Sequence, residues 1–410
     1  MAFFEQVTAS PNGDYLDAFS NVPTADPFFV GEAQFTYDLQ PLLYEQITAG
    51  NGTITHNTTE RCARLRINAA TGSGDKAIMQ SYQHYRYQAG RAIQIFLSFN
   101  FNDNTGVTNL RRFCEYGDGT NAIGFELNGT AKNFYIITGT TAPDQSVAQA
   151  SWNIDTLDGT GPSGITLDTS KAQILVIDAQ ALYVGQVRIG FDIDGTVIWC
   201  HKFLNANSLA YPYIQTANLP VRVGMESTGT TATDDDMFFI CNDVVSRGGS
   251  ELDIGFDFTA GASLTAGNGT RTHAFSLRPK TTFNSIANRI EFALTDIELL
   301  VTGTQPVYWE LCVGQALTTP SYADVNTTYS AFEYDTAGTL SGSPAIVITS
   351  GYCAASNQVT GNTSRGLTTK YPITLDSAGA VRSLGTLSLV VTGLGGTSDC
   401  RARLQWKEIR

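Results

Sequence analysis

Alternation of apolar and polar residues constrains the fold of this chain more than any other feature. In residues 92–101 (AIQIFLSFNF), apolar side chains recur at every second position, at Ile93, Ile95, Leu97 and Phe99. Successive side chains of a β-strand point to opposite faces, so this pattern predicts a strand with one apolar face. Helical periodicity is nearly absent along the chain. We therefore predict an all-β fold.

Turn residues divide the expected strands into hairpins. Asn128–Gly129 lies between two short alternating segments in residues 124–139, and Asp194–Gly195 lies between those of residues 187–203. Asn-Gly and Asp-Gly pairs favour two-residue hairpin turns, because both residues tolerate positive φ. Only 15% of the residues are charged and 39 are glycine, which suits many strands joined by many turns.

The composition and the apolar pattern of the sequence change along the chain. Residues 1–45 are aromatic and punctuated by proline, with little alternation, and we expect an extended N-terminal arm there. Residues 46–250 hold strands at the regular spacing of a β-sandwich. After a linker at residues 246–253 (SRGGSELD), a second all-β region covers residues 254–410. We predict two β-sandwich (jelly-roll-like) domains preceded by an arm.

Charge and hydropathy restrict the partners. The net charge of −13 argues against a nucleic-acid partner, which requires clustered Lys and Arg. No apolar run approaches the roughly 18 residues of a membrane span. The N-terminal residues lack a basic segment followed by an apolar core, so we expect no secretory signal and synthesis in a cytoplasm. We expect neither a nucleic acid nor a membrane as a partner.

Seven cysteines stand singly along the chain. No C-x-x-C spacing occurs, so we expect no zinc site and mostly buried thiols that act as small apolar groups. Because seven is odd, at least one thiol is free or pairs with another chain, and a disulfide between subunits is one hypothesis. The cysteines are Cys62, Cys114, Cys200, Cys241, Cys312, Cys353 and Cys400.

Residues 152–168 (WNIDTLDGTGPSGITLD) place aspartates among glycines, as a calcium loop also does. An EF-hand loop carries acids at alternate positions and a Glu that closes the loop. Here Asp155 and Asp158 lie three apart, Gly159 follows, and no Glu closes the loop. We predict an ordered connection between strands.

Two further groups of acids have two interpretations each. Asp192 and Asp194 project to one face of a strand and could hold a cation, but Asp194 stands where the hairpin needs its tip, which favours a turn. The run Asp234–Asp236 precedes an apolar strand, which is typical of a solvated turn or of charges that protect a strand from aggregation. We assign no metal site and no cofactor.

No catalytic constellation emerges from the sequence. None of the four histidines accompanies a nucleophile motif or a metal-binding motif, and paired carboxylates cannot be assigned from spacing in a β-sandwich. A triad assembled from distant residues stays open. We predict that the chain is not an enzyme and assign no catalytic, cofactor-binding or metal-ligating residue. The histidines are His56, His84, His201 and His273.

Two runs are rich in tyrosine: residues 81–88 (SYQHYRYQ) and residues 209–215 (LAYPYIQ). Tyrosine rings stack on sugars, bury well at protein interfaces, and also pack within strand faces. All three interpretations remain open at this point.

The order of several short segments resembles that in a widespread group of tailed-bacteriophage virion proteins. The resemblance extends over nearly the whole chain, and its specificity comes from the order, because each segment is short. The segments are DAF (17–19), PFF (27–29), FTYDLQPLLYEQ (35–46), SYQHYRYQAGRAIQIFLSFNF (81–101), LRRFCEYGDGTNAIGFELNG (110–129), SWNIDTLDGTGPSGITLD (151–168), GQVRIGFDIDGTVIWCHKF (185–203), NLPVR (218–222), TFNSIANRIEFALTDIELLVTGTQPVYWEL (282–311), YDTAGTLSG (334–342) and RARLQWKEIR (401–410).

The resemblance implies a concanavalin-like jelly roll followed by a second β-sandwich, without catalytic residues. It implies a structural component of a bacteriophage particle: a fibre, a neck or collar protein, or a capsid-decoration protein exposed on the particle surface. Such a protein would attach to other virion structural proteins through its arm and form a homo-oligomer, for which we expect a trimer. The alternatives are a carbohydrate-binding host-recognition module that binds a host surface glycan, and a polysaccharide depolymerase.

Overall fold

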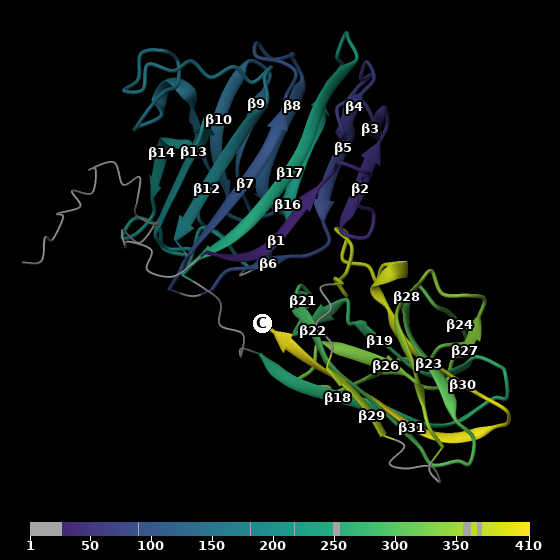
Figure 1. The fold of residues 1–410 in the computed structure, drawn as a ribbon. Coiled ribbons are helices and arrows are strands. Elements are labelled where there is room, and N and C mark those ends of the chain that lie inside the picture. The colour runs from purple at the N-terminus through teal and green to yellow at the C-terminus, as the bar shows by residue number, and fades with distance from the viewer. Residues whose placement is uncertain are drawn as a thin grey trace, which may run out of the picture. The chain divides into compact units, whose positions relative to one another are not determined.

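The computed structural model describes residues 27–410, apart from residues 89, 181, 217, 249–254, 356–361 and 367–370, and gives the backbone alone for residues 362–366. The chain divides into two compact units, Met1–Leu252 and Asp253–Arg410. Both are built of antiparallel sheets, which confirms the all-β prediction (Figure 1). The two helical segments described are single 3₁₀ turns, η1 (Gln149–Ser151) and η3 (Ser383–Gly385). Neither these nor any other described segment forms a helix that could cross a membrane.

The first unit contains two large sheets. The eight-stranded sheet has the order β14 (Thr196–Leu204), β13 (Gln186–Ile193), β12 (Gln173–Gln180), β7 (Ala92–Asn100), β17 (Asp235–Arg247), β4 (Cys62–Ile67) and β3 (Gly52–Asn57), and β1 (Phe28–Gln34) also pairs with β17. The seven-stranded sheet has the order β11 (Gln145–Ala148), β10 (Ala131–Ile137), β9 (Ala122–Asn128), β8 (Leu110–Gly117), β16 (Val221–Thr228), β5 (Ser73–Ser81) and β2 (Tyr44–Ala49). A short pair joins β6 (Tyr85–Arg86) and β15 (Asn218–Leu219).

The core of the first unit follows the alternation of the sequence. On β7, Ile93, Ile95, Leu97 and Phe99 are buried in one cluster with the inward residues of the neighbouring strands. The predicted hairpins are confirmed: β9 pairs with β10 about Asn128 and Gly129, and β13 pairs with β14 about Asp194 and Gly195. Positive φ at Gly129, Asp194 and Gly195 is the local reason, as these residue types adopt that geometry readily.

Residues 27–45 differ from the predicted arm. β1 pairs with β17 from Phe28 to Gln34, and Phe35 is fully buried with its ring centroid 4.8 Å from that of Phe239. The alternation was hard to recognise because β1 is irregular, with a register shift between Phe29 and Gly31. This part of the chain therefore belongs to the sandwich. Residues 1–26 lie outside the described residues, so the arm remains a prediction there.

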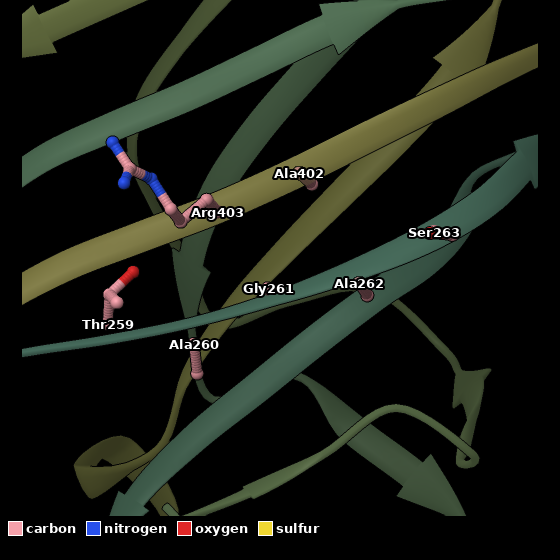
Figure 2. A pocket seen from close by; sticks show the side chains of 7 residues that line it. All are labelled: Thr259, Ala260, Gly261, Ala262, Ser263, Ala402 and Arg403. Atoms are coloured by element: carbon pink, nitrogen blue, oxygen red, sulfur yellow. The ribbon is translucent and has the colours of Figure 1, made fainter.

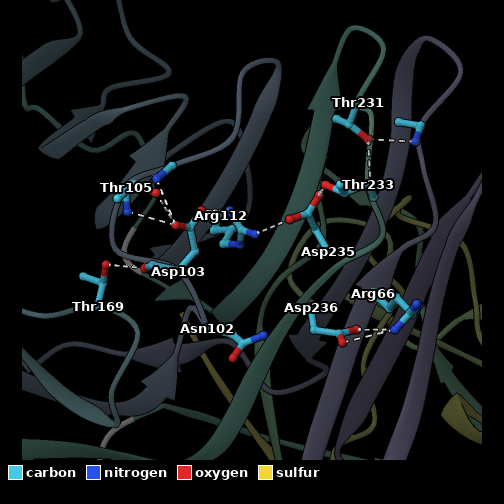
Figure 3. A network of polar contacts seen from close by, with 12 residues as sticks. Arg66, Asn102, Asp103, Thr105, Arg112, Thr169, Thr231, Thr233, Asp235 and Asp236 are labelled. Atoms are coloured by element: carbon cyan, nitrogen blue, oxygen red, sulfur yellow. Dashed lines mark hydrogen bonds and ion pairs between the residues drawn. The ribbon is translucent and has the colours of Figure 1, made fainter.

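The acidic run Asp234–Asp236 is a further correction, because β17 already begins at Asp235. The predicted solvated turn is wrong for Asp235 and Asp236, whose side chains are 10% and 17% exposed and bind arginines. Asp235 pairs with Arg112 at 2.9 Å (Figure 3). Asp236 pairs with Arg64 at 2.7 Å. These arginines lie more than a hundred residues away along the chain, so local charge patterning could not reveal the pairs.

The second unit has two main sheets around a separate core that includes Trp309 and Trp406. The four-stranded sheet has the order β18 (Phe256–Ala266), β31 (Ser398–Ile409), β22 (Glu291–Val301) and β29 (Asn362–Gly366). The six-stranded sheet has the order β25 (Ala323–Asp324), β26 (Phe332–Asp335), β19 (Thr272–Pro279), β30 (Leu387–Gly393), β23 (Val307–Val313) and β28 (Ile346–Cys353). Two short pairs join β20 (Thr282–Phe283) with β21 (Ile286–Ala287), and β24 (Ala316–Thr318) with β27 (Thr339–Ser341).

Candidate functional site

Residues 152–168 cover the outer edge of β14. The backbone N–H groups of Ile154 and Asp155 both donate to the carbonyl oxygen of Cys200, at 2.9 and 3.1 Å. The N–H of Lys202 donates to the side-chain oxygen of Asn153 at 2.9 Å. An edge strand normally presents unpaired backbone groups, and this stretch satisfies those of Cys200 and Lys202.

The aspartates of this stretch bind the backbone of the loop. Asp155 accepts hydrogen bonds from the N–H of Leu157 at 2.9 Å and of Ser163 at 2.7 Å. Asp158 accepts one from the N–H of Thr160 at 2.9 Å. The predicted ordered connection is thus confirmed. Across the described part of the chain, no three His, Cys, Asp or Glu side chains lie close enough together to hold a metal ion.

Apolar side chains hold the stretch on the core. The ring of Trp152 stacks on Phe134 with centroids 4.0 Å apart and an interplanar angle of 17°. Leu157 and Leu167 are buried in the same cluster. A loop with three buried anchors has a defined position, so it can form the wall of a site.

That wall borders a cavity of about 500 Å³ on the outer face of the eight-stranded sheet. The floor crosses three strands, because Ile174 on β12 lies opposite Ser98 on β7 and Asp192 on β13 in the register of the sheet. The lining residues are Ser98, Ile165, Thr166, Leu167, Asp168, Ala172, Gln173, Ile174, Asp192, Ile193, Asp194 and Ile240.

The cavity combines an aliphatic floor with acidic groups. Ile174 is 37% exposed and offers an open apolar surface. Hydrogen bonds from the hydroxyl and the N–H of Ser170, at 2.6 and 3.0 Å, lower the pKa of the Asp168 carboxyl, so it stays ionised in mild acid. Asp192 uses one oxygen to accept the N–H of Gly195 at 2.9 Å. Small-molecule sites typically pair an apolar lining with a few placed polar groups.

The sequence drew attention to these aspartates but did not reveal that they line one cavity together. The turn predicted at Asp192–Asp194 is confirmed, and both residues also line the cavity with Asp168. A separation of more than twenty residues hides this grouping, since only the pairing of β12 with β13 brings the segments together. The alternation in residues 187–203 is the signal that could have placed Asp192 on the face away from the core.

A second polar cluster lies on the outer face of the seven-stranded sheet. Arg111 binds Glu126 at 2.5 Å and Glu226 at 3.2 Å, while Arg222 binds Glu115 at 2.7 Å. Arg111 and Glu115 flank Phe113 on one strand face, a pattern visible in the sequence. These glutamates were not predicted as a group because they come from three strands. Each is held by an arginine, so the cluster stabilises the sheet.

The histidines serve the fold. His201 accepts the N–H of Asn153 at 3.2 Å through Nδ1. The other three contact main-chain or side-chain oxygens: Phe35 O for His56, Tyr82 O for His84 and Ser276 Oγ for His273.

One of these contacts belongs to an arrangement like a catalytic triad. Ser276 Oγ lies 2.8 Å from Nε2 of His273, whose Nδ1 lies 3.9 Å from a carboxylate oxygen of Asp335. Sequence reasoning left such an assembly open. However, Ser276 is fully buried and its hydroxyl also contacts Ser388 at 2.6 Å. Since a nucleophile must reach its substrate, the arrangement as it stands is a polar group in the core.

Burial of His201 predicts a pH-dependent stability. It lowers the pKa of this imidazole from 6.5 to about 4. Between these values the unfolded chain binds a proton that the folded chain does not bind, so the free energy of unfolding falls as the pH falls through this window. We expect a loss of about 3 kcal/mol in the first unit, from about 1.4 kcal/mol per pKa unit. Urea unfolding above and below the window measures it. His201→Gln should reduce the loss, and an unchanged loss would contradict the assignment.

The tyrosine-rich runs meet and mostly pack inward. The two runs meet at the ring of Tyr183, and Tyr85 and Tyr213 are buried. The ring of Tyr183 lies 4.7 Å from Tyr87 and 5.6 Å from Tyr213, both edge-on. Of the three interpretations, the structure favours packing, with Tyr211 as the exposed exception at 58%.

All seven cysteines are free thiols, and six of them are buried. Burial raises the pKa of the Cys114 and Cys400 thiols, among others, which keeps them protonated and poorly reactive. Cys241 alone is half-buried. It is the thiol best placed for the predicted disulfide between subunits, which remains a hypothesis.

No protein-family model matches the chain, and no curated protein matches it. Solved structures resemble it in fold. An endo-1,3-β-glucanase from Streptomyces sioyaensis is 10% identical with a TM-score of 0.37, over 56% of this chain and 99% of its own. An endo-β-1,4-glucuronan lyase from the fungus Trichoderma reesei is 10% identical with a TM-score of 0.37, over 54% and 96%. The carbohydrate recognition domain of Emp46p is 11% identical with a TM-score of 0.32, over 52% and 94%.

The prediction that the chain is not an enzyme does not hold, because it depended only on the absence of a catalytic motif, and catalytic groups can assemble from residues far apart in a sequence. Glucanases and a lyase are among the solved structures of similar fold. At this level of identity the likeness is one of fold alone. A fold neither provides nor excludes an activity, because the chemistry depends on the side chains that it carries.

Proposed function

We propose that this protein is a structural component of a bacteriophage particle whose first unit binds a carbohydrate. The cavity beside residues 152–168 supports the proposal that the first unit binds a carbohydrate. The ordered sequence resemblance to virion proteins supports the proposal that the protein is a structural component of a particle.

The cavity suits a sugar in size and chemistry. Its volume of about 500 Å³ lies within the roughly 300–1,000 Å³ of small-molecule sites. The aliphatic surface of Ile174 would pack on the C–H face of a sugar ring. The carboxylates of Asp168, Asp192 and Asp194 would accept hydrogen bonds from sugar hydroxyls, and bonds to charged groups are the stronger ones.

The charge of the cavity selects the class of glycan. Three aspartates line it, and the whole chain carries a net charge of −13. An anionic polysaccharide would meet like charges at the rim. We therefore propose a neutral host-surface polysaccharide as the ligand.

Filling the cavity should abolish the binding. Ile174→Trp would occupy the floor, and we expect at least a tenfold weaker affinity, about 1.4 kcal/mol or more. Isothermal titration calorimetry with neutral and anionic polysaccharides measures it. The matched control is Leu300→Trp, because Leu300 in the second unit is 40% exposed against 37% for Ile174.

Three outcomes bear on the proposal. Tight binding of neutral glycans by Ile174→Trp would contradict the cavity as the site. Release of new reducing ends during the titration would favour the polysaccharide depolymerase over a binding module. To test the structural role, mass spectrometry of purified particles of the encoding phage should detect this protein. Particles that lack the protein would refute that role.

A further inference from the structure

The second unit has a long edge strand without a partner in the described residues. β18 pairs with β31 along its full length, and no described strand pairs with its other side. At 11 residues it is the longest edge strand of the described sheets. Such an edge presents a row of backbone N–H and C=O groups that can pair with another strand.

Within the described residues, β18 lacks the usual features that prevent pairing. Proteins protect edges with lysine, proline, bulges or a covering segment. The sequence of β18, FDFTAGASLTA, has one charged residue, Asp257, and its register with β31 has no shift. In the first unit, by contrast, residues 153–155 cover the edge of β14.

A shallow concavity of about 390 Å³ follows the middle of β18 (Figure 2). Its side chains are small apart from Arg403, whose guanidinium binds Glu298 at 2.7 Å. Because Ala402 and Arg403 belong to β31, the concavity lies over the face of the sheet beside the free edge. The small side chains of β18 present little bulk to a strand that approaches this edge. The lining residues are Thr259, Ala260, Gly261, Ala262, Ser263, Ala402 and Arg403.

We infer that β18 pairs antiparallel with β18 of a second copy of this chain, about a two-fold axis at Gly261. Gly261 is the central residue of Phe256–Ala266, so all 11 residues find a partner in this register. Asp257 of one copy lies opposite Thr265 of the other, so like charges do not meet. A two-fold interface of this kind closes a dimer.

The side chains are complementary in this register. Phe258 lies opposite Leu264 on the inward face, which adds an apolar cross-strand pair at each end. On the outward face Thr259 lies opposite Ser263, and both are exposed in the single chain. In this register β18 pairs apolar residues with apolar residues and small polar residues with small polar residues. We therefore take a second copy of the chain as the partner. The inference concerns the second unit and does not depend on the proposed function.

Substitutions that place like or opposite charges across the proposed β18 interface test both the pairing and its register. Thr259→Lys with Ser263→Lys places lysines opposite each other twice, and we expect a dimer dissociation constant about tenfold weaker. Thr259→Glu with Ser263→Glu should weaken it similarly. An equal mixture of the two variants should restore the dimer, because each lysine then lies opposite a glutamate. Sedimentation over a range of concentrations measures all three.

The control is Thr53→Lys with Thr55→Lys on β3, two exposed threonines on the same face of another edge strand. It should leave the dimer intact. Hydrogen exchange of the unmodified protein gives a readout without substitution, as β18 amides should exchange more slowly at high concentration. A monomer at every concentration, a dimer unaffected by the β18 lysines, or no recovery in the mixture of folded variants would overturn the inference.

Discussion

Arg112→Leu is expected to lower the free energy of unfolding of the first unit by about 3–5 kcal/mol, the typical cost of breaking a buried ion pair. The Arg112 side chain is 2% exposed and binds Asp103 and Asp235, each at 2.9 Å (Figure 3). Arg112 lies on β8 of the seven-stranded sheet, and Asp235 lies on β17 of the eight-stranded sheet. The substitution would leave two carboxylates between the sheets without their cation.

Chemical denaturation, with hydrogen exchange to separate the two units, measures this loss. Arg66→Leu is the control: its side chain is 26% exposed, and Asp236 keeps Arg64 in its absence, so about 1 kcal/mol or less is expected. Adding Asp103→Asn and Asp235→Asn to Arg112→Leu should recover part of the loss, because the uncompensated charges disappear. An equal loss for Arg112→Leu and Arg66→Leu would disprove the role of burial.

Trp152→Ala should cost the first unit about 3–5 kcal/mol, as large-to-small substitutions of buried aromatic residues do. Trp152 is 5% exposed and stacks on Phe134. It begins the stretch that covers the edge of β14 and forms one wall of the cavity. Loss of this anchor should also speed the exchange of the Ile154 and Asp155 amides and weaken carbohydrate binding.

The conservative variant separates packing from a general loss of structure. Trp152→Phe keeps an aromatic ring on Phe134, so it should retain most of the stability and the slow exchange of both amides. If the alanine variant keeps the binding and the slow exchange, other residues of the stretch hold it in place. Leu157 and Leu167, both buried, would then be the next to replace.

The alternation along β7 and the turn pairs Asn128–Gly129 and Asp194–Gly195 were enough to predict strands and hairpins. Their preferences are local, since side-chain direction and positive φ depend on neighbouring residues alone. The loop at residues 152–168 was predictable for the same reason, from its glycines and the missing Glu. The sequence by itself thus determined the fold class and the local turns.

Tertiary structure alone decided which of these elements meet. The pairing of β1 with β17 joins segments about two hundred residues apart, and it changed the expected arm into part of a sheet. The cavity and the Arg112 bridge likewise depend on strand order and register. Local preferences do not specify such contacts, because they form only when the whole apolar face of each sheet is buried against its partner.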